Sequence, residues 1–316
     1  MLVNSHDATT VTTMQEPTHT TNTTKMTLRH WHDYYELCKP RVVALIVFTA
    51  IVGMFLATPG MVPLQPLIFG TLGIGLAAAS AAAINQIVDQ QVDSVMGRTS
   101  RRPLPTGHLT NRQAIIFAGI IGVIAMLILM FLVNMLTALL TFMSLIGYAV
   151  IYTVFLKRAT PQNIVIGGAA GAAPPVLGWT AVTGQIDPNS LLLFLIIFAW
   201  TPPHFWALAI HRRDEYAKAD IPMLPVTHGL EFTRLHVLLY TIILTIVTIL
   251  PYLTGMSGLI YLLSTVILDG IFLYFAIRMQ RVHTGNIAMR TFGYSIIYLM
   301  LMFTALLVDH YLRVVF

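Results

Sequence analysis

The chain has 316 residues, of which 56% are hydrophobic and only 10% are charged. A soluble globular domain usually has about a quarter of its residues charged, so this composition excludes a soluble enzyme and indicates an integral membrane protein. We attribute the formal net charge of +5 to lysines and arginines on one face of a bilayer, and expect no nucleic-acid partner. The single cysteine, Cys38, excludes an internal disulfide framework and a four-cysteine metal site.

Residues 1–34 form a polar, Thr-rich segment. They lack the apolar run of a secretory signal. A mitochondrial transit peptide also fits poorly, because the first arginine is Arg29 and the segment carries acids. We expect a disordered cytosolic tail here, followed by one membrane domain over residues 35–316.

Nine segments are long and apolar enough to cross a bilayer, which takes roughly 17–25 residues. We expect these spans over residues 42–58, 66–88, 113–133, 136–156, 162–182, 190–211, 234–254, 257–277 and 292–312. If the N-terminus is cytoplasmic, 17 of the 18 lysines and arginines fall on the cytoplasmic side, as the positive-inside rule requires. The sequence therefore predicts an all-α membrane protein with nine transmembrane helices and a cytoplasmic N-terminus.

The second span ends in three polar residues, Asn85, Asp89 and Asp93, which we call the first acid cluster. Four residues turn a helix by about 400°, so the three side chains are expected to form one stripe. An amide and two carboxylates are hard oxygen ligands that suit Mg²⁺, which proteins commonly share with substrate phosphates. The cluster therefore predicts a magnesium–diphosphate site.

The sixth span ends at the same face as the second, because both run from the outer to the cytoplasmic side. It is followed by Asp214, Glu215 and Asp220, which we call the second acid cluster. A second acidic group across a cavity would allow two metal ions to hold one diphosphate. Next to the first acid cluster, Arg98 and Arg102 supply forked donors for phosphate oxygens.

A structural interpretation of these acids is that they reach the lipid headgroups from helix ends, beside compensating arginines. Two acids in register with an amide, and a second cluster at the same face, favour function instead, because acids near hydrocarbon are costly. Asp269 in the eighth span has no partner that the sequence identifies.

The fifth span contains Gly167, Gly168 and Gly171. Small residues at this spacing usually allow two membrane helices to pack closely, and we expect no chemistry from them.

In the sixth span, Pro202 and Pro203 directly precede His204 in the stretch WTPPHFWALAI. Paired prolines remove backbone donors, so we expect a broken helix beside a cavity. An intramembrane histidine among aromatic residues is often only packed and hydrogen-bonded. Beside a broken helix we favour a functional role for His204.

At these residues the chain resembles the UbiA-type intramembrane prenyltransferases, in the branch that farnesylates haem. The stretch NQIVDQQVDSVMGRTSRRPLPTG matches that family's Asn-x3-Asp-x3-Asp signature, and the similarity extends through residues 38–42, 152–179, 200–216 and 221–226. The resemblance covers most of the chain from residue 35 onward. It implies nine helices around a central cavity, with the diphosphate site at the cytoplasmic mouth. The second motif departs from the family, because Asp214-Glu215-Tyr216 stands where two aspartates usually precede the tyrosine.

The resemblance also implies the reaction, in which a farnesyl group passes from farnesyl diphosphate to a vinyl group of haem B, giving haem O and diphosphate. Mg²⁺ is the implied cofactor, haem B is a substrate, and a downstream haem A synthase is an implied partner in a bacterial inner membrane. The implied catalytic residues are Asn85, Asp89, Asp93, His204, Asp214, Glu215 and Tyr216. The implied metal ligands are Asn85, Asp89, Asp93 and Asp214. The implied diphosphate-binding residues are Arg98, Arg102, Lys157 and Arg158.

Two alternatives remain open from the sequence. A UbiA-type enzyme acting on another acceptor, such as an aromatic acid or chlorophyllide, would need the same acids and arginines. A transporter that uses intramembrane acids to couple ions would instead show internal repeats and broken helices in corresponding halves. The sequence has one proline-rich break and no convincing repeat, so a prenyltransferase is favoured. His204 would orient the porphyrin, bind its iron or handle a proton.

Overall fold

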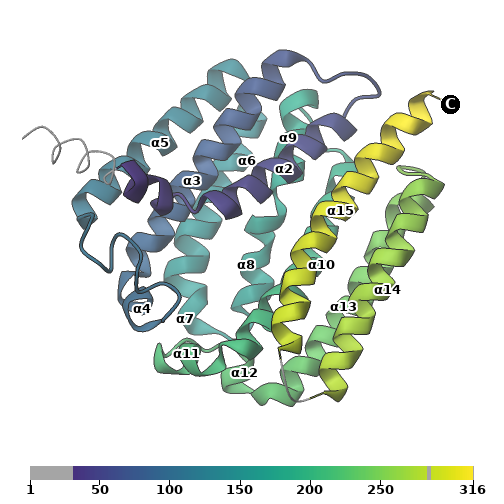
Figure 1. Ribbon diagram of the computed structural model, residues 1–316. Helices are drawn as coiled ribbons and strands as arrows, with labels where there is room; N and C mark the ends of the chain where they lie inside the picture. Colours follow the sequence, from purple (N-terminus) through teal and green to yellow (C-terminus); the bar gives the residue numbers. More distant parts are fainter. Residues whose placement is uncertain (1–30, 283–285, 316) are drawn as a thin grey trace, which may run out of the picture.

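The computed structural model describes residues 31–282 and 286–315. Within these residues the chain is helical and has no strand, and Figure 1 shows the long helices side by side. The first half contains the helix Trp31–Leu37, α2 (Pro40–Leu56), η1 (Pro66–Gly70), α3 (Thr71–Val88), α4 (Gln90–Val95), α5 (Asn111–Leu132), α6 (Met135–Ile146), η2 (Gly147–Leu156) and α7 (Lys157–Ala159). The second half contains α8 (Asn163–Ala172), α9 (Pro174–Thr183), α10 (Pro188–His211), α11 (Arg213–Lys218), α12 (Leu224–Thr227), α13 (Gly229–Leu253), α14 (Leu259–Arg281) and α15 (Ile287–Val315).

These helices confirm the predicted all-α membrane fold. Among the described residues, eight segments are long and apolar enough to cross a membrane, and a ninth is the bent pair Trp31–Leu37 and Pro40–Leu56. The predicted boundaries differ most at the first span, whose bent pair begins at Trp31 and not at residue 42. The helices α13 and α15 begin at Gly229 and Ile287, five residues before the expected starts. The cytoplasmic location of the N-terminus stays a prediction.

The first span is bent by 55° where its two helical parts meet. Pro40 occupies the first turn of α2, and a proline disfavours the helical conformation in the residue before it. That residue, Lys39, has a positive φ of 50°. Residues 31–34, which the sequence assigned to the tail, belong to the first helical part. The rest of the predicted tail, residues 1–30, lies outside the described residues.

The fourth span contains a ten-residue π-helix, η2, between α6 and α7. The sequence predicted an ordinary helix here, because the apolar pattern does not distinguish the two. A π-helix adds a residue to each turn, and such turns are frequent at functional sites. In this span it lies next to α3 and α8, so it contributes side chains to the end of α3.

The sixth span, α10, is the most buried: 67% of its most apolar stretch lies inside the protein, compared with 17% for α5. The predicted break at Pro202 and Pro203 is wrong, since α10 runs without interruption from Pro188 to His211. Each proline removes one backbone donor from the helix. Packing against α8, α13 and α15 surrounds this stretch, and we attribute the continuity of the helix to that packing.

The close packing predicted from the glycines is confirmed at two of the three positions. A Cβ on Gly167 would lie 2.2 Å from Cδ2 of Tyr152 in η2, and one on Gly168 would lie 3.0 Å from Cγ2 of Thr201 in α10. At Gly171, a Cβ would meet nothing within 4 Å. The first two glycines therefore let α8 pack tightly between η2 and α10.

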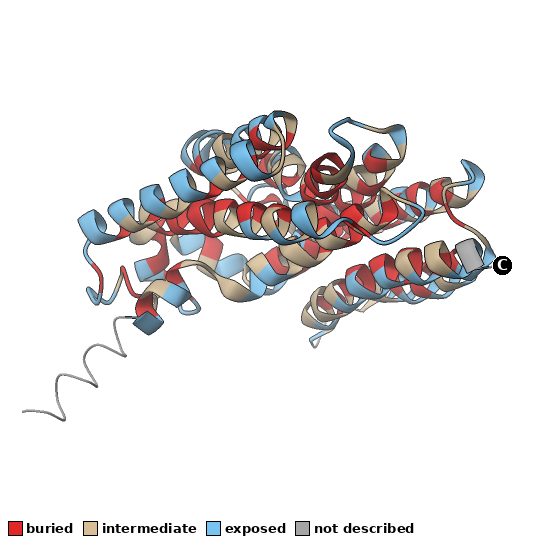
Figure 2. Cartoon of the chain, turned by 90° about the horizontal axis from the view of Figure 1, so that it is seen from above, coloured by how far each residue is buried: buried red, intermediate tan, exposed pale blue. Residues whose placement is uncertain are grey.

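Buried positions lie where helices face one another, and exposed positions lie on the outer sides (Figure 2). Many exposed side chains on α5, α6, α13 and α14 are large and apolar, as expected for a surface in contact with lipid. The short helices α4, α7, α11 and α12 gather at one end of the molecule (Figure 1). The polar site is built at that end.

Candidate active site

The first acid cluster lies where α3 passes into α4. Asn85 is in the last turns of α3, Asp89 separates the two helices, and Asp93 is in α4. The backbone bonds from Asp89 N to Asn85 O (3.0 Å) and from Asp93 N to Asp89 O (2.8 Å) keep the three residues in helical register. Each of the three is 4% exposed. The spacing in the sequence thus produces one buried polar stripe, as predicted.

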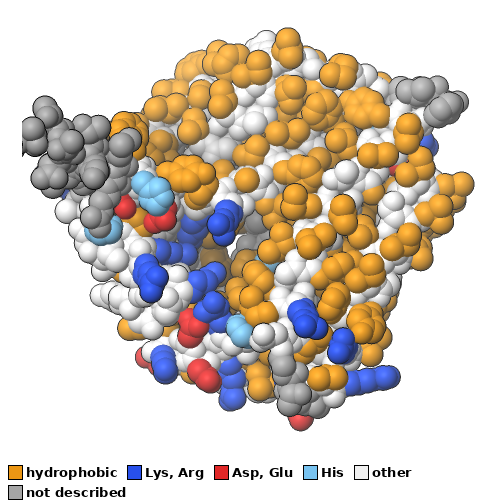
Figure 3. All heavy atoms as spheres, viewed as in Figure 1, with side chains coloured by type: hydrophobic (Ala, Val, Ile, Leu, Met, Phe, Trp, Pro, Cys, Tyr) orange, Lys and Arg blue, Asp and Glu red, His pale blue; other side chains and the backbone are white. Residues whose placement is uncertain are grey.

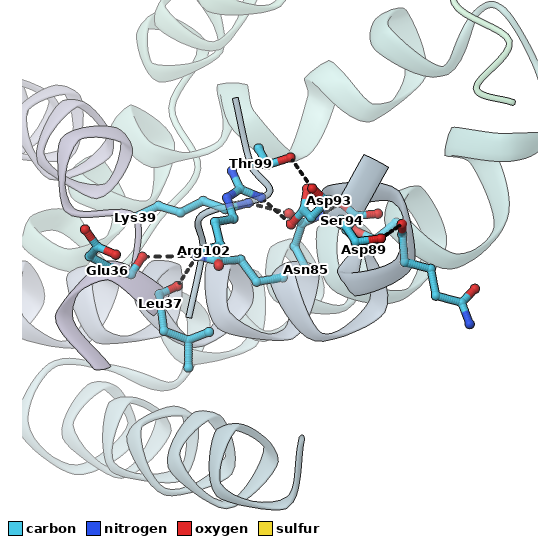
Figure 4. A network of polar contacts seen from close by, with 12 residues as sticks. Glu36, Leu37, Lys39, Asn85, Asp89, Asp93, Ser94, Thr99 and Arg102 are labelled. Atoms are coloured by element: carbon cyan, nitrogen blue, oxygen red, sulfur yellow. Dashed lines mark hydrogen bonds and ion pairs between the residues drawn. The ribbon is translucent and has the colours of Figure 1, made fainter. Parts of the chain in front are cut away.

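Three cationic side chains from three other segments contact this stripe. Lys157 Nζ lies 2.6 Å from Asp89 Oδ2, and Arg102 donates to Asp93 Oδ2 at 2.6 Å. Lys39 Nζ donates to Asn85 Oδ1. Figure 4 shows Lys39 and Arg102 extending toward Asn85 and Asp93. Formally the cluster carries three positive and two negative charges, so it favours an additional anion.

Lys39 is a member of this cluster that sequence reasoning missed, because it was counted only among the positive charges of the cytoplasmic side. The bend in the first span places it. Gln86 Nε2 donates to the carbonyls of Glu36 and Leu37, each at 3.0 Å. These carbonyls lie in the last turn of the first helical part, where the helix supplies few backbone donors; Glu36 O also accepts from Lys39 N at 3.1 Å. In the sequence, the Lys39-Pro40 step is the signal that could have predicted this bend.

Asn85 is oriented by the π-helix. Thr153 Oγ1 donates to the carbonyl of Tyr148 at 2.7 Å and therefore accepts from Asn85 Nδ2 at 3.1 Å. Asn85 Nδ2 also donates to Asp89 Oδ2 at 3.0 Å. This network assigns the amide so that its oxygen faces Lys39. Thr153, which sequence reasoning did not identify, therefore keeps the amide oxygen of Asn85, a hard oxygen ligand, directed at Lys39.

The second acid cluster is only partly drawn into the site. Glu215 forms an ion pair with Arg212, while its Oε2 and Arg212 Nε are buried and unpaired. Asp214 and Asp220 are exposed. Within the described residues, no group of three or more His, Cys, Asp or Glu side chains is arranged to hold a metal ion. Metal binding at this site would therefore involve oxygens of the first acid cluster together with those of a substrate.

Tyr216 follows Glu215 in α11 and is close enough to both acid clusters to feel the charges of Glu215 and Asp89. Its side chain is 7% exposed. Burial raises the pKa of the Tyr216 hydroxyl, and the positive charge of Arg98 opposes that shift, while Asp89 adds to it. The hydroxyl therefore stays protonated at neutral pH and is a donor, and Arg98 and Asp89 both act on it electrostatically.

Arg158 lies elsewhere. It is exposed and lines a cavity of about 370 Å³ with Gln90, Gln91 and Asn111. Ile87, Val88 and Thr153 line the same cavity, and Thr153 bonds to Asn85, so the cavity adjoins the first acid cluster. Within the described residues, however, no hydrogen bond or ion pair joins Arg158 to Asn85, Asp89 or Asp93. The structure thus does not bring Arg158 to the first acid cluster, in contrast to its neighbour Lys157.

The histidine of the sixth span is enclosed by aromatic rings. His204 is 7% exposed, and its ring stacks on Trp200 at 4.2 Å and on Phe292 at 4.6 Å between centroids. Its Nδ1 lies 2.6 Å from Ser295 Oγ. Trp200 and His204 come from α10, and Phe292 and Ser295 from α15. The histidine is thus held in a fixed plane between two helices.

Asp269 is also satisfied inside the membrane domain. Tyr298 OH donates to Asp269 Oδ1 at 2.6 Å, and Thr248 Oγ1 donates to Oδ2 at 2.8 Å. These bonds join α13, α14 and α15. We interpret Asp269 as a structural group that connects the three helices.

Figure 3 shows that the protein surface is hollowed beneath α2 in this view, with lysine and arginine side chains on one side of the hollow and hydrophobic atoms around the other. The fold is embedded in the membrane, and its buried acid cluster is contacted by three cations and surrounded by apolar side chains. These features define a class of membrane proteins that bind substrates with an anionic headgroup on an apolar chain. Comparison with known proteins agrees.

The pattern of the UbiA prenyltransferase family matches residues 46–307. Two curated relatives are the protoheme IX farnesyltransferases of Methylococcus capsulatus and Alcanivorax borkumensis. Each is 63% identical, over 89% and 90% of this chain respectively and 95% of each relative. The chain therefore belongs to the UbiA prenyltransferase family. This result confirms the resemblance and decides against the transporter alternative.

Solved structures show the same fold. A digeranylgeranylglyceryl phosphate synthase matches with a TM-score of 0.75 at 18% identity, covering 90% of this chain and 99% of the other. A UbiA homologue from Archaeoglobus fulgidus bound to DMAPP and Mg²⁺ matches with a TM-score of 0.61 at 18% identity, covering 87% of this chain and 99% of that one.

Proposed function

We propose that this chain transfers a farnesyl group from farnesyl diphosphate to a vinyl group of haem B, with hydration, and releases haem O and diphosphate. The observation that carries the donor half is the convergence of Lys39, Arg102 and Lys157 on the buried first acid cluster. The acceptor half is supported by relatives at 63% identity that are named protoheme IX farnesyltransferase.

The residues present fit a divalent cation. Asn85 offers an amide oxygen and Asp89 and Asp93 offer carboxylates, all buried and on one stripe. Mg²⁺ is usually held by one or two carboxylates together with substrate phosphates, and an Archaeoglobus homologue was solved with DMAPP and Mg²⁺. When bound, the ion would neutralise charge on the diphosphate leaving group. We assign Asn85, Asp89 and Asp93 as its ligands, with Asp214 and Glu215 at the rim.

The cationic side chains would stabilise the departing diphosphate. As the bond between the allylic carbon and the diphosphate oxygen breaks, negative charge grows on that oxygen. Arg102 and Lys157 would then turn from their carboxylates toward the diphosphate, and Lys39 would add a third charge. Such preorganised charges are most effective where water is excluded. Arg98 and Tyr216 would contact the diphosphate from the outer rim, and the exposed Arg158 would attract it electrostatically toward the site.

The acceptor vinyl group would then attack the allylic carbon with its terminal carbon. The positive charge moves to the carbon beside the porphyrin ring, where water adds and loses a proton to leave a hydroxyl group. His204 lies in α10 between the rings of Trp200 and Phe292. We assign His204 to the acceptor, and the apolar helices to the farnesyl chain.

The proposed function also implies a membrane location, an orientation and a downstream enzyme. The chain is a multi-pass membrane protein, and we place it in a bacterial inner membrane with the N-terminus and the acid clusters on the cytoplasmic side. A haem A synthase would use the product as a downstream partner.

The test uses membranes that contain the chain, supplied with haem B and farnesyl diphosphate. Haem extraction and mass spectrometry should detect a haem heavier by one farnesyl group and one water. Asp93→Asn should prevent its formation. A prenylated aromatic acid with unchanged haem would replace the proposed acceptor and leave the diphosphate site intact.

A further inference from the structure

His204 is held by α15 through both the side chain and the backbone of one residue. Ser295 Oγ lies 2.6 Å from His204 Nδ1, and Ser295 O accepts a hydrogen bond from Trp200 Nε1 at 2.8 Å. Ser295 is completely buried. It therefore anchors the histidine and Trp200, one of the two rings that stack on the imidazole.

The contacts of Ser295 decide which histidine nitrogen carries the proton. Ser295 Oγ also lies 2.6 Å from the carbonyl oxygen of Phe292. A carbonyl has no proton, so at this distance the serine hydroxyl must donate its single proton to it. The hydroxyl is then an acceptor toward His204, and Nδ1 must be the donor. The network thus assigns the Nδ1-protonated tautomer to His204.

In this tautomer, Nε2 carries a free lone pair. Within the described part of the chain, the imidazole of His204 makes one hydrogen bond, from Nδ1 to Ser295. Nε2 therefore has no hydrogen-bond partner among these residues. The rings of Trp200 and Phe292 cover both faces of the imidazole, with interplanar angles of 20° and 27°. The ring of Phe205 packs at 82° to the same imidazole, with 4.8 Å between centroids. A ligand would therefore reach Nε2 along the part of the ring edge that Phe205 does not contact.

A neutral imidazole with one N–H donated to the protein and the other nitrogen free is the usual arrangement of a metal-ligating histidine. We propose that Ser295 is a positioning residue, whose hydroxyl fixes this tautomer and so presents His204 Nε2 to the iron of the haem acceptor. This inference rests on the proposed function, because the acceptor there is a haem. It assigns His204 one of the three roles left open by the sequence.

The first test titrates haem B into the purified full-length chain and follows the absorption spectrum. Ser295→Ala should lower haem affinity about 10- to 100-fold, the usual effect of losing such a supporting contact, and leave the KM for farnesyl diphosphate unchanged. His204→Ala should abolish the histidine-ligated spectrum. Ser295→Thr keeps the hydroxyl and should restore much of the affinity.

Thr291→Val is the matched control. Thr291 is a completely buried hydroxyl one turn away on α15, and it donates only to the carbonyl of its own helix, at Ile287. This variant should bind haem normally. If Thr291→Val weakens haem binding as much as Ser295→Ala does, the effect is one of packing and the proposal is wrong.

The second test determines the tautomer directly by ¹⁵N-histidine NMR on the wild-type protein. The variant His204→Gln serves only to assign the signal of His204. A proton on Nε2 of His204 would overturn the role of Ser295 even if haem O is made. Conversely, a protonated Nδ1 in a chain that prenylates another acceptor would overturn the proposed function and iron ligation while leaving the tautomer assignment intact.

Discussion

At the scale of single residues, the site contains carboxylates that are already paired with cations. Asp89 is bonded to Lys157 and Asp93 to Arg102, so each acid has two roles in the proposed function. It holds a positively charged side chain in place before the substrate arrives, and it becomes a metal ligand afterwards. Removing one charge therefore affects both roles.

We expect Asp89→Asn to lower prenyl transfer at limiting Mg²⁺ by at least about 100-fold, since losing even a supporting contact of a metal site costs about 10- to 100-fold. Raising the Mg²⁺ concentration should recover part of the loss. The measurement is turnover in detergent against Mg²⁺ concentration. Asp220→Asn is the control, because Asp220 is exposed and its φ of 52° is one that asparagine tolerates. Near-normal activity of Asp89→Asn at limiting Mg²⁺ would contradict the metal assignment.

Two neighbouring arginines provide a second prediction. Arg102 is bonded to Asp93 at 2.6 Å, whereas Arg101 is exposed. A hydrogen bond to a charged group contributes about 1.5–3 kcal/mol. Arg102→Ala should therefore raise the KM for farnesyl diphosphate by roughly 10- to 100-fold, and Arg101→Ala should have little effect. Equal effects of the two substitutions would indicate a general basic patch.

The spacing of Asn85, Asp89 and Asp93 predicted their shared stripe because helical geometry relates them locally. Lys39 and Thr153 are 46 and 68 residues away from Asn85. Their positions depend on how helices pack, and a single sequence contains no local signal for such packing. The sequence therefore identified the residues on α3 and α4, but not Lys39 and Thr153, which bond to Asn85.

At the scale of elements, the hydropathy pattern located every span after the first within about a turn and a half, because a membrane helix must be apolar along its length. It did not reveal the π-helix in the fourth span. It also misjudged the sixth span, since the effect of Pro202 and Pro203 depends on the helices packed around α10. Departures from ideal helix geometry are decided by tertiary contacts.

The tight packing of α8 on η2 gives a prediction at this scale. A methyl group on Gly167 would overlap the Tyr152 ring, at 2.2 Å from Cδ2, whereas one on Gly171 would meet nothing within 4 Å. Overpacking of this kind typically costs about 1–3 kcal/mol. Gly167→Ala should lower the apparent melting temperature in detergent and reduce turnover by displacing η2, which carries Thr153. Gly171→Ala should do neither. If both variants melt like the wild type, η2 is free to move away from α8.

At the scale of the whole molecule, the charge pattern and the fold agree on one polar end. Parity of the spans predicted that the second and sixth spans end at the same face, and α4 and α11 lie at the same end of the structure (Figure 1). The apolar sides of the helices face outward over the rest of the surface.

The sidedness follows from the positive-inside rule, and it is tested by labelling single cysteines. In a Cys38→Ser background that retains activity, Lys218→Cys places a thiol in α11 at the polar end, and Gln185→Cys places one in the connection between α9 and α10 at the other end; both positions are exposed. On right-side-out vesicles, an impermeant maleimide should label Gln185→Cys at once and Lys218→Cys only after the membrane is opened. The opposite pattern would place the diphosphate site outside the cell, away from a cytoplasmic supply of prenyl diphosphate. Labelling of both in sealed vesicles would show that α10 does not cross the membrane.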